Sequence, residues 1–151
     1  MTRLERCKLA IEQGYIYDHE TGLVYNKNKE IGFISSTGYK KMKLRYNKKS
    51  YELRIHHFAW YYIYKQCVQE IDHINGIRID NRICNLRSVT RQQNQWNRLT
   101  AKGYYKIIYK DSIYYCAQIY LNTKRIRLGS YNTEEEARQA YLAAKQIYHV
   151  I

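Results

Sequence analysis

The sequence lacks the long apolar stretch that a membrane-crossing helix requires. No run approaches the roughly 18 consecutive apolar residues of a membrane span, and the opening residues do not have the pattern of a signal peptide. Leucine and valine are scarce as well, so we expect many of the 18 tyrosines to lie in the core. The lack of a membrane span and of a signal-peptide pattern leads us to expect a cytoplasmic protein.

Cysteine is sparse and follows no ligand pattern. The four cysteines are widely separated and form no C-x-x-C motif: Cys7, Cys67, Cys84 and Cys116. A structural zinc site or a disulfide framework would require closer or more regular spacing. We therefore expect reduced thiols and no structural zinc.

Acidic residues are outnumbered by basic ones. The chain has 13 Asp and Glu against 26 Lys and Arg, which gives a net charge of +13. Such a charge favours a polyanionic partner, either nucleic acid or an anionic membrane surface. Without a membrane segment we favour nucleic acid, to which the tyrosines offer stacking faces and hydroxyl donors.

The most informative stretch covers residues 70–98, EIDHINGIRIDNRICNLRSVTRQQNQWNR. Asp72 and His73 end a short strand-like run, and a polar loop follows. A second apolar-rich run covers 85–89, and residues 90–98 have helical spacing. The pattern predicts a strand, a loop, a second strand and a helix.

These residues suit the hydrolysis of a phosphodiester, which requires a base and a cation. His73 has the side chain whose usual pKa of about 6.5 lets it accept a proton from water. Asp72 and Asn94 would supply the hard oxygen ligands that Mg²⁺ or Mn²⁺ prefers. The amide of Asn85 would tie the intervening loop back and so hold His73 in place.

Taken singly, each of these residues also fits a position without a function in catalysis, because Asp-His pairs are often solvated surface pairs and lone asparagines often lie in turns. The joint order of Asp72-His73, Asn85 and Asn94 resembles the ββα metal finger of HNH nucleases. The resemblance implies a metal-dependent DNA endonuclease with one Mg²⁺ or Mn²⁺ per finger.

The residues before the finger predict a short helix over 3–13, with Leu4, Cys7 or Lys8, and Ile11 on one side, followed by three or four β segments. Their basic residues fit a strand surface lying on DNA and equally a solvated face. This region resembles the strand-rich leader of phage HNH proteins. Residues 55–66 predict a core helix, whose His56 and His57 we interpret as core or capping residues and exclude from the metal site.

Arginines surround the predicted site. Arg91 and Arg98 share a helix face with Asn94 by their i, i+3 and i+7 spacing, while others flank the loop. Each alone fits a generic surface charge, but together they predict contacts with DNA phosphates: Arg78, Arg82, Arg87, Arg91 and Arg98.

From residue 102 onward the pattern predicts three strands, with turns at Asp111-Ser112 and Asn122-Thr123, and a helix over 133–149. Thr133 and Glu136 have capping-box spacing. The helix presents a small apolar stripe, which we expect to pack on the sheet: Ala137, Ala140, Tyr141, Ala144 and Ile147.

Strand alternation predicts that Ile113, Tyr115, Ala117, Ile119 and Leu121 face this helix. The segments YYCAQI and KRIRLGSYNTEEEARQAY resemble an AP2-type DNA-binding domain, in which the opposite face of the sheet contacts DNA. By motif position, that resemblance implies these DNA contacts: Lys106, Ile108, Gln118, Tyr120, Arg125 and Arg127.

We therefore predict an α+β protein with an N-terminal helix and β-rich leader (1–50), an HNH ββα-metal nuclease domain (51–100) and an AP2-like domain (101–151). The combination resembles homing endonucleases of phages or mobile elements, acting on double-stranded DNA in a bacterial or phage-infected cell. A non-catalytic DNA-binding regulator with a vestigial finger is the alternative, and an RNA-directed protein a third. The pattern leaves a monomer and a homodimer equally open.

Overall fold

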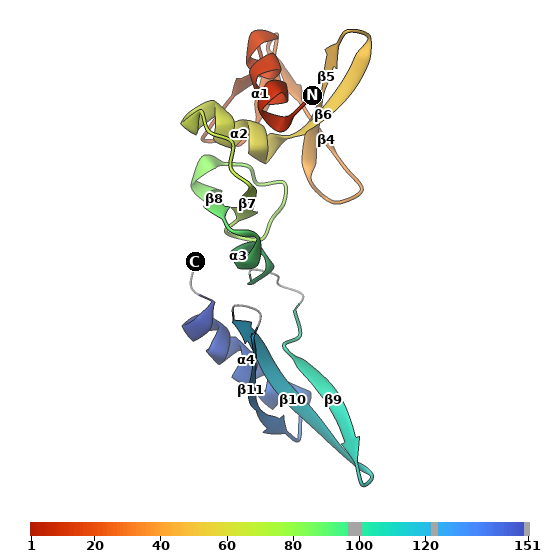
Figure 1. The fold of residues 1–151 in the computed structure, drawn as a ribbon. Coiled ribbons are helices and arrows are strands. Elements are labelled where there is room, and N and C mark those ends of the chain that lie inside the picture. Colours follow the sequence, from red (N-terminus) through yellow and green to blue (C-terminus); the bar gives the residue numbers. More distant parts are fainter. Residues whose placement is uncertain (97–100, 122–123, 150–151) are drawn as a thin grey trace. The chain divides into compact units, whose positions relative to one another are not determined.

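The computed structural model of the chain describes residues 1–96, 101–121 and 124–149 (Figure 1). The contacts within the chain divide it into two compact units, Met1–Asn94 and Gln95–Ile151, which are described separately. Among the described residues, no helix combines the length and apolar character needed to cross a membrane.

The first unit begins with helix α1 (Arg3–Glu12), whose N-cap Thr2 forms a capping box with Glu5. The predicted helix is confirmed. Of the residues predicted to share one of its sides, Cys7 is buried, whereas Leu4 and Ile11 are 40% and 37% exposed. The helix instead buries Cys7 together with Leu9 and Ala10, which pack into the core around α2.

Six short strands follow α1, more than the three or four that the sequence predicted. They form two antiparallel sheets, β1 (Ile16–Tyr17) with β2 (Val24–Asn26) and β3 (Lys29–Ile31), and β4 (Phe33–Ile34) with β5 (Lys40–Tyr46) and β6 (Lys49–Arg54). Lys27-Asn28 and Asn47-Lys48 both adopt positive φ, as two-residue hairpin turns of type I′ require. These tight turns explain how so many strands fit into 40 residues.

Helix α2 (Ile55–Tyr64) lies at the centre of this unit. Ile55, Phe58 and Ala59 are completely buried, which confirms the predicted core helix. Buried residues of α2 share one hydrophobic core with residues of α1, β2, β5 and β6, which precede α2 in the sequence. The same core includes residues of the hairpin that follows α2. Residues from both sides of position 50 therefore share a core, and the boundary predicted there stays a prediction.

The finger consists of β7 (Glu70–His73), a 3-10 turn (Ile83–Asn85), β8 (Leu86–Val89) and α3 (Arg91–Trp96). The two strands pair antiparallel, and the helix follows directly (green in Figure 1). Ile71 and Leu86 anchor the hairpin in the core of the unit. This order matches the predicted strand, loop, strand and helix.

The second unit is the predicted three-stranded antiparallel sheet with one helix. The strands β9 (Tyr104–Tyr109), β10 (Ser112–Leu121) and β11 (Lys124–Tyr131) lie in the order β11-β10-β9, and α4 (Glu134–Tyr148) packs on them through Tyr141 and Ala144 against Ile119. The first turn lies at Lys110-Asp111 rather than at Asp111-Ser112. The turn predicted at Asn122-Thr123 lies outside the described residues.

Helix α4 begins with the predicted capping box of Thr133 and Glu136. Its buried stripe contains Ala137, Tyr141 and Ala144, but the predicted member Ile147 is 70% exposed. At about 100° per residue, Ile147 lies about 80° around the helix from Ala137. The helical phase therefore removes it from the packed side.

The register of β9 corrects one prediction about the sheet. Lys106 pairs with Tyr115 and Ile108 pairs with Ile113. Cross-strand partners point to the same side of a sheet, so Lys106 and Ile108 belong to the same side as Ala117 and Ile119, the side on which α4 packs. Their predicted position on the opposite side is wrong, because a two-residue turn pairs even-numbered residues with odd-numbered ones.

The opposite side of the sheet carries the other four predicted DNA contacts. Gln118 pairs with Arg127 and Tyr120 with Arg125, so these four side chains share one side. On β9 the neighbours on that side are Tyr105 and Ile107, which pair with Cys116 and Tyr114. The side that faces away from α4 is therefore more aromatic than the sequence predicted.

Candidate active site

The hairpin of β7 and β8 places Asp72 and His73 at one strand end. Asp72 pairs with Arg87 and His73 with Leu86, so alternation directs the two to opposite sides of the hairpin. Both are buried, at 8% and 4% exposure, and the negative charge of Asp72 still acts on the imidazole of His73. The strand end thus brings a carboxylate and an imidazole close together from different sides.

Asp72 is held by an ion pair. Arg87 donates from Nε and Nη2 to Oδ2 of Asp72, at 3.0 and 2.8 Å. The sequence predicted Arg87 as a contact to DNA, but this geometry gives it a protein carboxylate as a partner. The ion pair neutralises the carboxylate that was predicted to bind the cation.

Asn94, on α3, lies over the side of the hairpin that carries Asp72. Its Nδ2 donates to Oε2 of Glu70 at 3.0 Å, and Glu70 shares a strand side with Asp72. Since the amide nitrogen donates to Glu70, the oxygen Oδ1 of Asn94 is the atom left to act as a ligand. Sequence reasoning missed Glu70, although its position two residues before Asp72 on a strand was the available signal.

His73 is oriented by Asn81, a second residue whose role was missed. Nε2 of His73 lies 3.2 Å from Oδ1 of Asn81, which is only 1% exposed. Nδ2 of Asn81 donates to the carbonyl of Ile79, and Tyr17 donates from its hydroxyl to the carbonyl of Asn81. Because Oδ1 can only accept, Nε2 of His73 carries the hydrogen and Nδ1 carries the lone pair that can take up a proton.

The surroundings keep His73 neutral. Burial lowers the pKa of His73 below its usual value, and this effect outweighs the hydrogen bond that His73 donates to Asn81 and the charges of Asp72 and Asp80, which raise the pKa. A neutral imidazole at physiological pH can act as a general base.

Asn85 bridges the loop between the two strands. Its Oδ1 accepts from the backbone N–H of Asn75 at 3.0 Å, and its Nδ2 donates to Oδ1 of Asn75 at 3.0 Å and to the carbonyl of Asp80 at 2.8 Å. These contacts are of the kind expected of a loop brace. Its contribution to catalysis stays a prediction.

Arg82 is also engaged within the loop. It donates to the carboxylate of Asp80 at 2.8 and 2.7 Å, and this contact lowers the pKa of Asp80 to about 2. The predicted DNA contact at Arg82 would therefore compete with an existing ion pair.

A cationic and aromatic cluster adjoins His73. The ring of Tyr39 lies 6.0 Å from that of His73, and the guanidinium groups of Arg54 and Arg78 lie 4.8 and 5.1 Å from the Tyr39 ring centre. Nη1 of Arg78 also donates to the carbonyl of Thr37 at 2.8 Å. Tyr39 and Arg54 precede the finger in sequence, so no local spacing could reveal them.

His56 packs beneath the same cluster. It is 2% exposed, and its ring meets that of His73 edge-on with centres 5.1 Å apart. Within the described parts of the chain, Nδ1 of His56 has no hydrogen-bond partner. Burial, followed by the charges of His57 and His73, holds the pKa of His56 well below its usual value.

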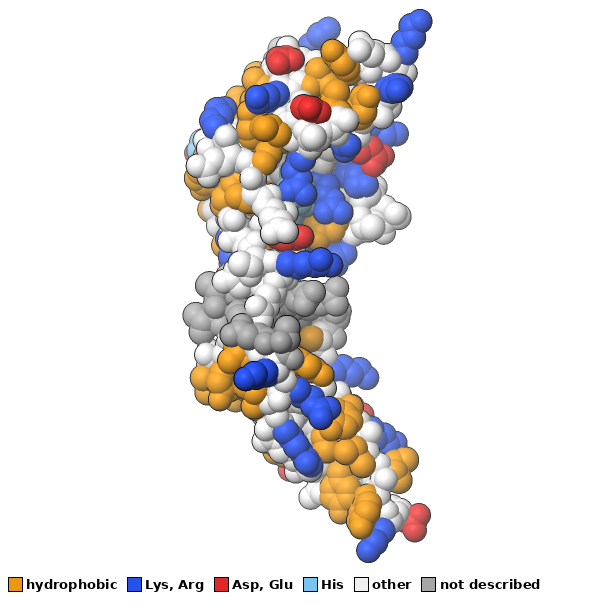
Figure 2. Space-filling model, in the orientation of Figure 1, with side chains coloured by type: hydrophobic (Ala, Val, Ile, Leu, Met, Phe, Trp, Pro, Cys, Tyr) orange, Lys and Arg blue, Asp and Glu red, His pale blue; other side chains and the backbone are white. Residues whose placement is uncertain are grey.

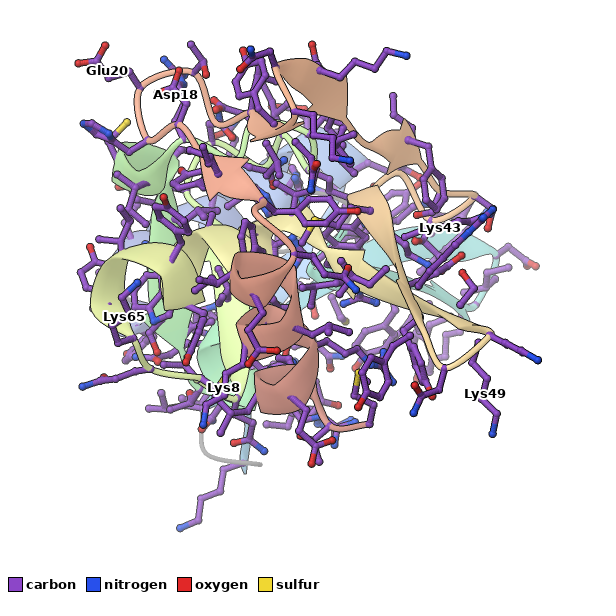
Figure 3. The ribbon with its side chains drawn as sticks, turned by 90° about the horizontal axis from the view of Figure 1, so that it is seen from above. Lys8, Asp18, Glu20, Lys43, Lys49 and Lys65 are labelled. Atoms are coloured by element: carbon purple, nitrogen blue, oxygen red, sulfur yellow. The ribbon has the colours of Figure 1, made fainter. Side chains whose placement is uncertain are left out.

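The remaining predicted contacts are distributed over both units. Arg91 is exposed on α3, and Arg98 lies outside the described residues. In the second unit Arg125 is exposed, while Arg127 donates from Nη2 to Oγ of Ser130 at 2.6 Å. Figure 2 shows Lys and Arg side chains spread over the visible face of the first unit, with a cluster in its lower part, and others along the second unit. Figure 3 shows Lys49 pointing outward at the hairpin of β5 and β6.

The donor set decides which cation would fit. Among residues 1–96, 101–121 and 124–149, no group of three or more His, Cys, Asp or Glu side chains is arranged to hold a metal ion. Asp72 and Asn94 offer one carboxylate and one amide oxygen. Mg²⁺ and Mn²⁺ bind to such sparse oxygen sets because they retain several waters, whereas a zinc site requires more protein ligands.

Comparisons with known proteins found one family model and one solved structure similar to parts of this chain. Residues 54–96, which contain α2, β7, β8 and α3, match the family model of HNH endonucleases. The chain is also similar to a solved structure that concerns DNA binding and cleavage by the HNH homing endonuclease I-HmuI. The TM-score is 0.49 and the sequence identity is 25%, over 57% of this chain and 52% of that one. This chain thus spans about half the length of that enzyme. No curated protein matches the chain.

The match confirms the predicted resemblance of this segment to HNH endonucleases. The AP2-like character of the second unit stays a prediction.

The buried histidines predict that acid destabilises the first unit. Burial, and after it the charges of Arg3 and Arg54, lower the pKa of His57 to about 3, and the pKa values of His56 and His73 are lowered too. Protonation therefore favours the unfolded chain. Stability is complete above the unfolded pKa of about 6.5 and falls below it, by up to about 1.4 kcal/mol per pH unit for each histidine that stays neutral in the fold.

Urea unfolding between about pH 7.5 and pH 5 measures this loss. His57→Phe should make the dependence on pH shallower, by up to about 1.4 kcal/mol per pH unit. His19→Phe is the matched control, since His19 is exposed, and should leave the slope unchanged. Equal slopes for His57→Phe and the unaltered chain would contradict the assignment of buried neutral histidines.

Proposed function

We propose that this chain is a metal-dependent, site-directed DNA endonuclease of the HNH homing type. One observation carries the proposal: Asn81 orients the buried, neutral His73 at the end of the strand that presents Asp72. The family match over 54–96 supports it.

In the proposed reaction, Nδ1 of His73 removes a proton from a water molecule as the water oxygen attacks the phosphorus. The bond between phosphorus and the leaving oxygen breaks, and that oxygen takes a proton from solvent water. Asn81 keeps the hydrogen on Nε2 throughout, which preserves Nδ1 as the proton acceptor. Asp72 and Asn94 would hold a divalent cation, which would act as a Lewis acid on the phosphate and the leaving oxygen.

Positive side chains beside His73 would position the DNA strand. Arg54 and Arg78 flank Tyr39 next to the imidazole, and guanidinium groups bind phosphate oxygens well. The net charge of +13 would steer the protein to DNA and make binding weaken steeply with salt.

The second unit would recognise the target in the manner of an AP2-like domain. Its side opposite α4 carries Gln118, Tyr120, Arg125 and Arg127, and such groups can read base edges and contact phosphates. In this arrangement the sheet finds the site and the finger cuts it. One finger cuts one strand per encounter, so a double-strand break requires a homodimer or two successive visits.

One observation favours a second candidate, a non-catalytic DNA-binding regulator with a vestigial finger. Arg87 already neutralises Asp72, the predicted ligand carboxylate. A finger that had lost its cation would have this kind of internal ion pair.

A nicking assay separates these two functions. With Mg²⁺ or Mn²⁺ at about 5–10 mM, the chain should relax supercoiled plasmid, and EDTA should stop the reaction. His73→Ala should lower the rate at least about 100-fold, because it removes the general base, while the exposed His19→Ala should not. Tight duplex binding without cleavage of any plasmid would support the regulator instead.

Duplex affinity tests the proposed recognition surface. Arg125→Gln and Lys106→Gln each remove one positive charge, from opposite sides of the sheet. Fluorescence anisotropy in EDTA should show that Arg125→Gln weakens binding about tenfold, and that Lys106→Gln weakens it less than about twofold. Equal losses would mean that the side opposite α4 is not the recognition surface.

A further inference from the structure

Arg87 is a charged residue of the finger that has no part in the proposed reaction but contacts a predicted cation ligand. It lies directly across the hairpin from Asp72, and both of its contacting nitrogens reach the same oxygen, Oδ2. The side chain of Asp72 is 9% exposed and that of Arg87 is 26% exposed. The pair is therefore shielded from water on the carboxylate side, where charge interactions are stronger than at a surface.

The same finger contains a second pair that serves as a comparison. Arg82 donates to Asp80 at 2.8 and 2.7 Å, but Asp80 lies in the loop and is not a predicted cation ligand. Both pairs place a guanidinium against a carboxylate. They differ in whether that carboxylate is needed by the cation.

We propose that Arg87 is a positioning residue that holds Asp72 in place and competes with the divalent cation for it. The inference rests on the proposed function, since it assumes that Asp72 is a cation ligand. A guanidinium next to the ligand cancels part of its charge and repels an incoming dication. The finger of the DNA-free protein would therefore bind its cation weakly.

The strength of the competition follows from Coulomb's law. A single positive charge about 6 Å from a dication lowers its affinity about tenfold at the dielectric constant of water, and further where water is excluded. Removing that charge should therefore tighten cation binding about tenfold.

The test measures binding of Mn²⁺ alone to the DNA-free full chain, by calorimetry and by the electron paramagnetic resonance signal of free Mn²⁺. Arg87→Gln should bind Mn²⁺ about tenfold more tightly than the unaltered chain. Arg82→Gln removes the same charge from the comparison pair and should change the affinity less than about twofold. Asp72→Asn should abolish the binding in either background.

Equal or weaker Mn²⁺ binding by Arg87→Gln would overturn the proposed competition. If Arg87→Gln fails to fold, Arg87→Met carries the test. Methionine removes the charge and keeps an unbranched side chain, so a gain of about tenfold is expected and no gain would overturn the proposal. Mn²⁺ binding that survives Asp72→Asn would instead contradict the proposed metal site, and with it the proposed function.

Discussion

The hydrogen bond between His73 and Asn81 is the interaction on which the candidate site depends. It joins the end of β7 to the loop that follows, and it sets which imidazole nitrogen can accept a proton. Asn81 is itself held from outside the finger, because Tyr17 of β1 donates to its carbonyl. Burial of this network is costly unless its polar groups are paired. The strands before the finger thus help to define the chemistry within it.

The two sides of the β7–β8 hairpin separate the tasks of the site. One side carries His73, packed against Tyr39 and His56 above the core. The other carries Asp72 and Glu70, which engage Arg87 and Asn94 respectively. Each predicted ligand therefore has a partner of its own, and such partners orient metal ligands and tune their affinity. A sparse oxygen site of this kind suits a cation that is bound weakly and exchanged readily.

The spacing of residues in the sequence predicted most helices and strands of this chain. It could not predict contacts between residues that are far apart in the sequence. The capping box at Thr133 and the strand order around Asp72 depend on neighbours in the sequence, so spacing alone revealed them. Tyr39 reaches His73 from a distant hairpin, which no spacing rule describes. Lys106 was assigned to the wrong side of its sheet because alternation within one strand does not state how it pairs with the next. Strand pairing also determines the partner of Arg87, because the register of β7 and β8 places Arg87 directly across from Asp72.

The most direct test of the proposed metal site is to locate the cation by nuclear magnetic resonance. Small amounts of Mn²⁺ broaden signals from nuclei close to the ion. We predict that the side-chain amide of Asn94 and the backbone amides of Asp72 and His73 broaden first, before signals around Asp18, a carboxylate in a turn of the same unit. Broadening centred on Asp18 or on Asp80, with Asn94 unaffected, would contradict the assignment of the finger as a metal-dependent nuclease site.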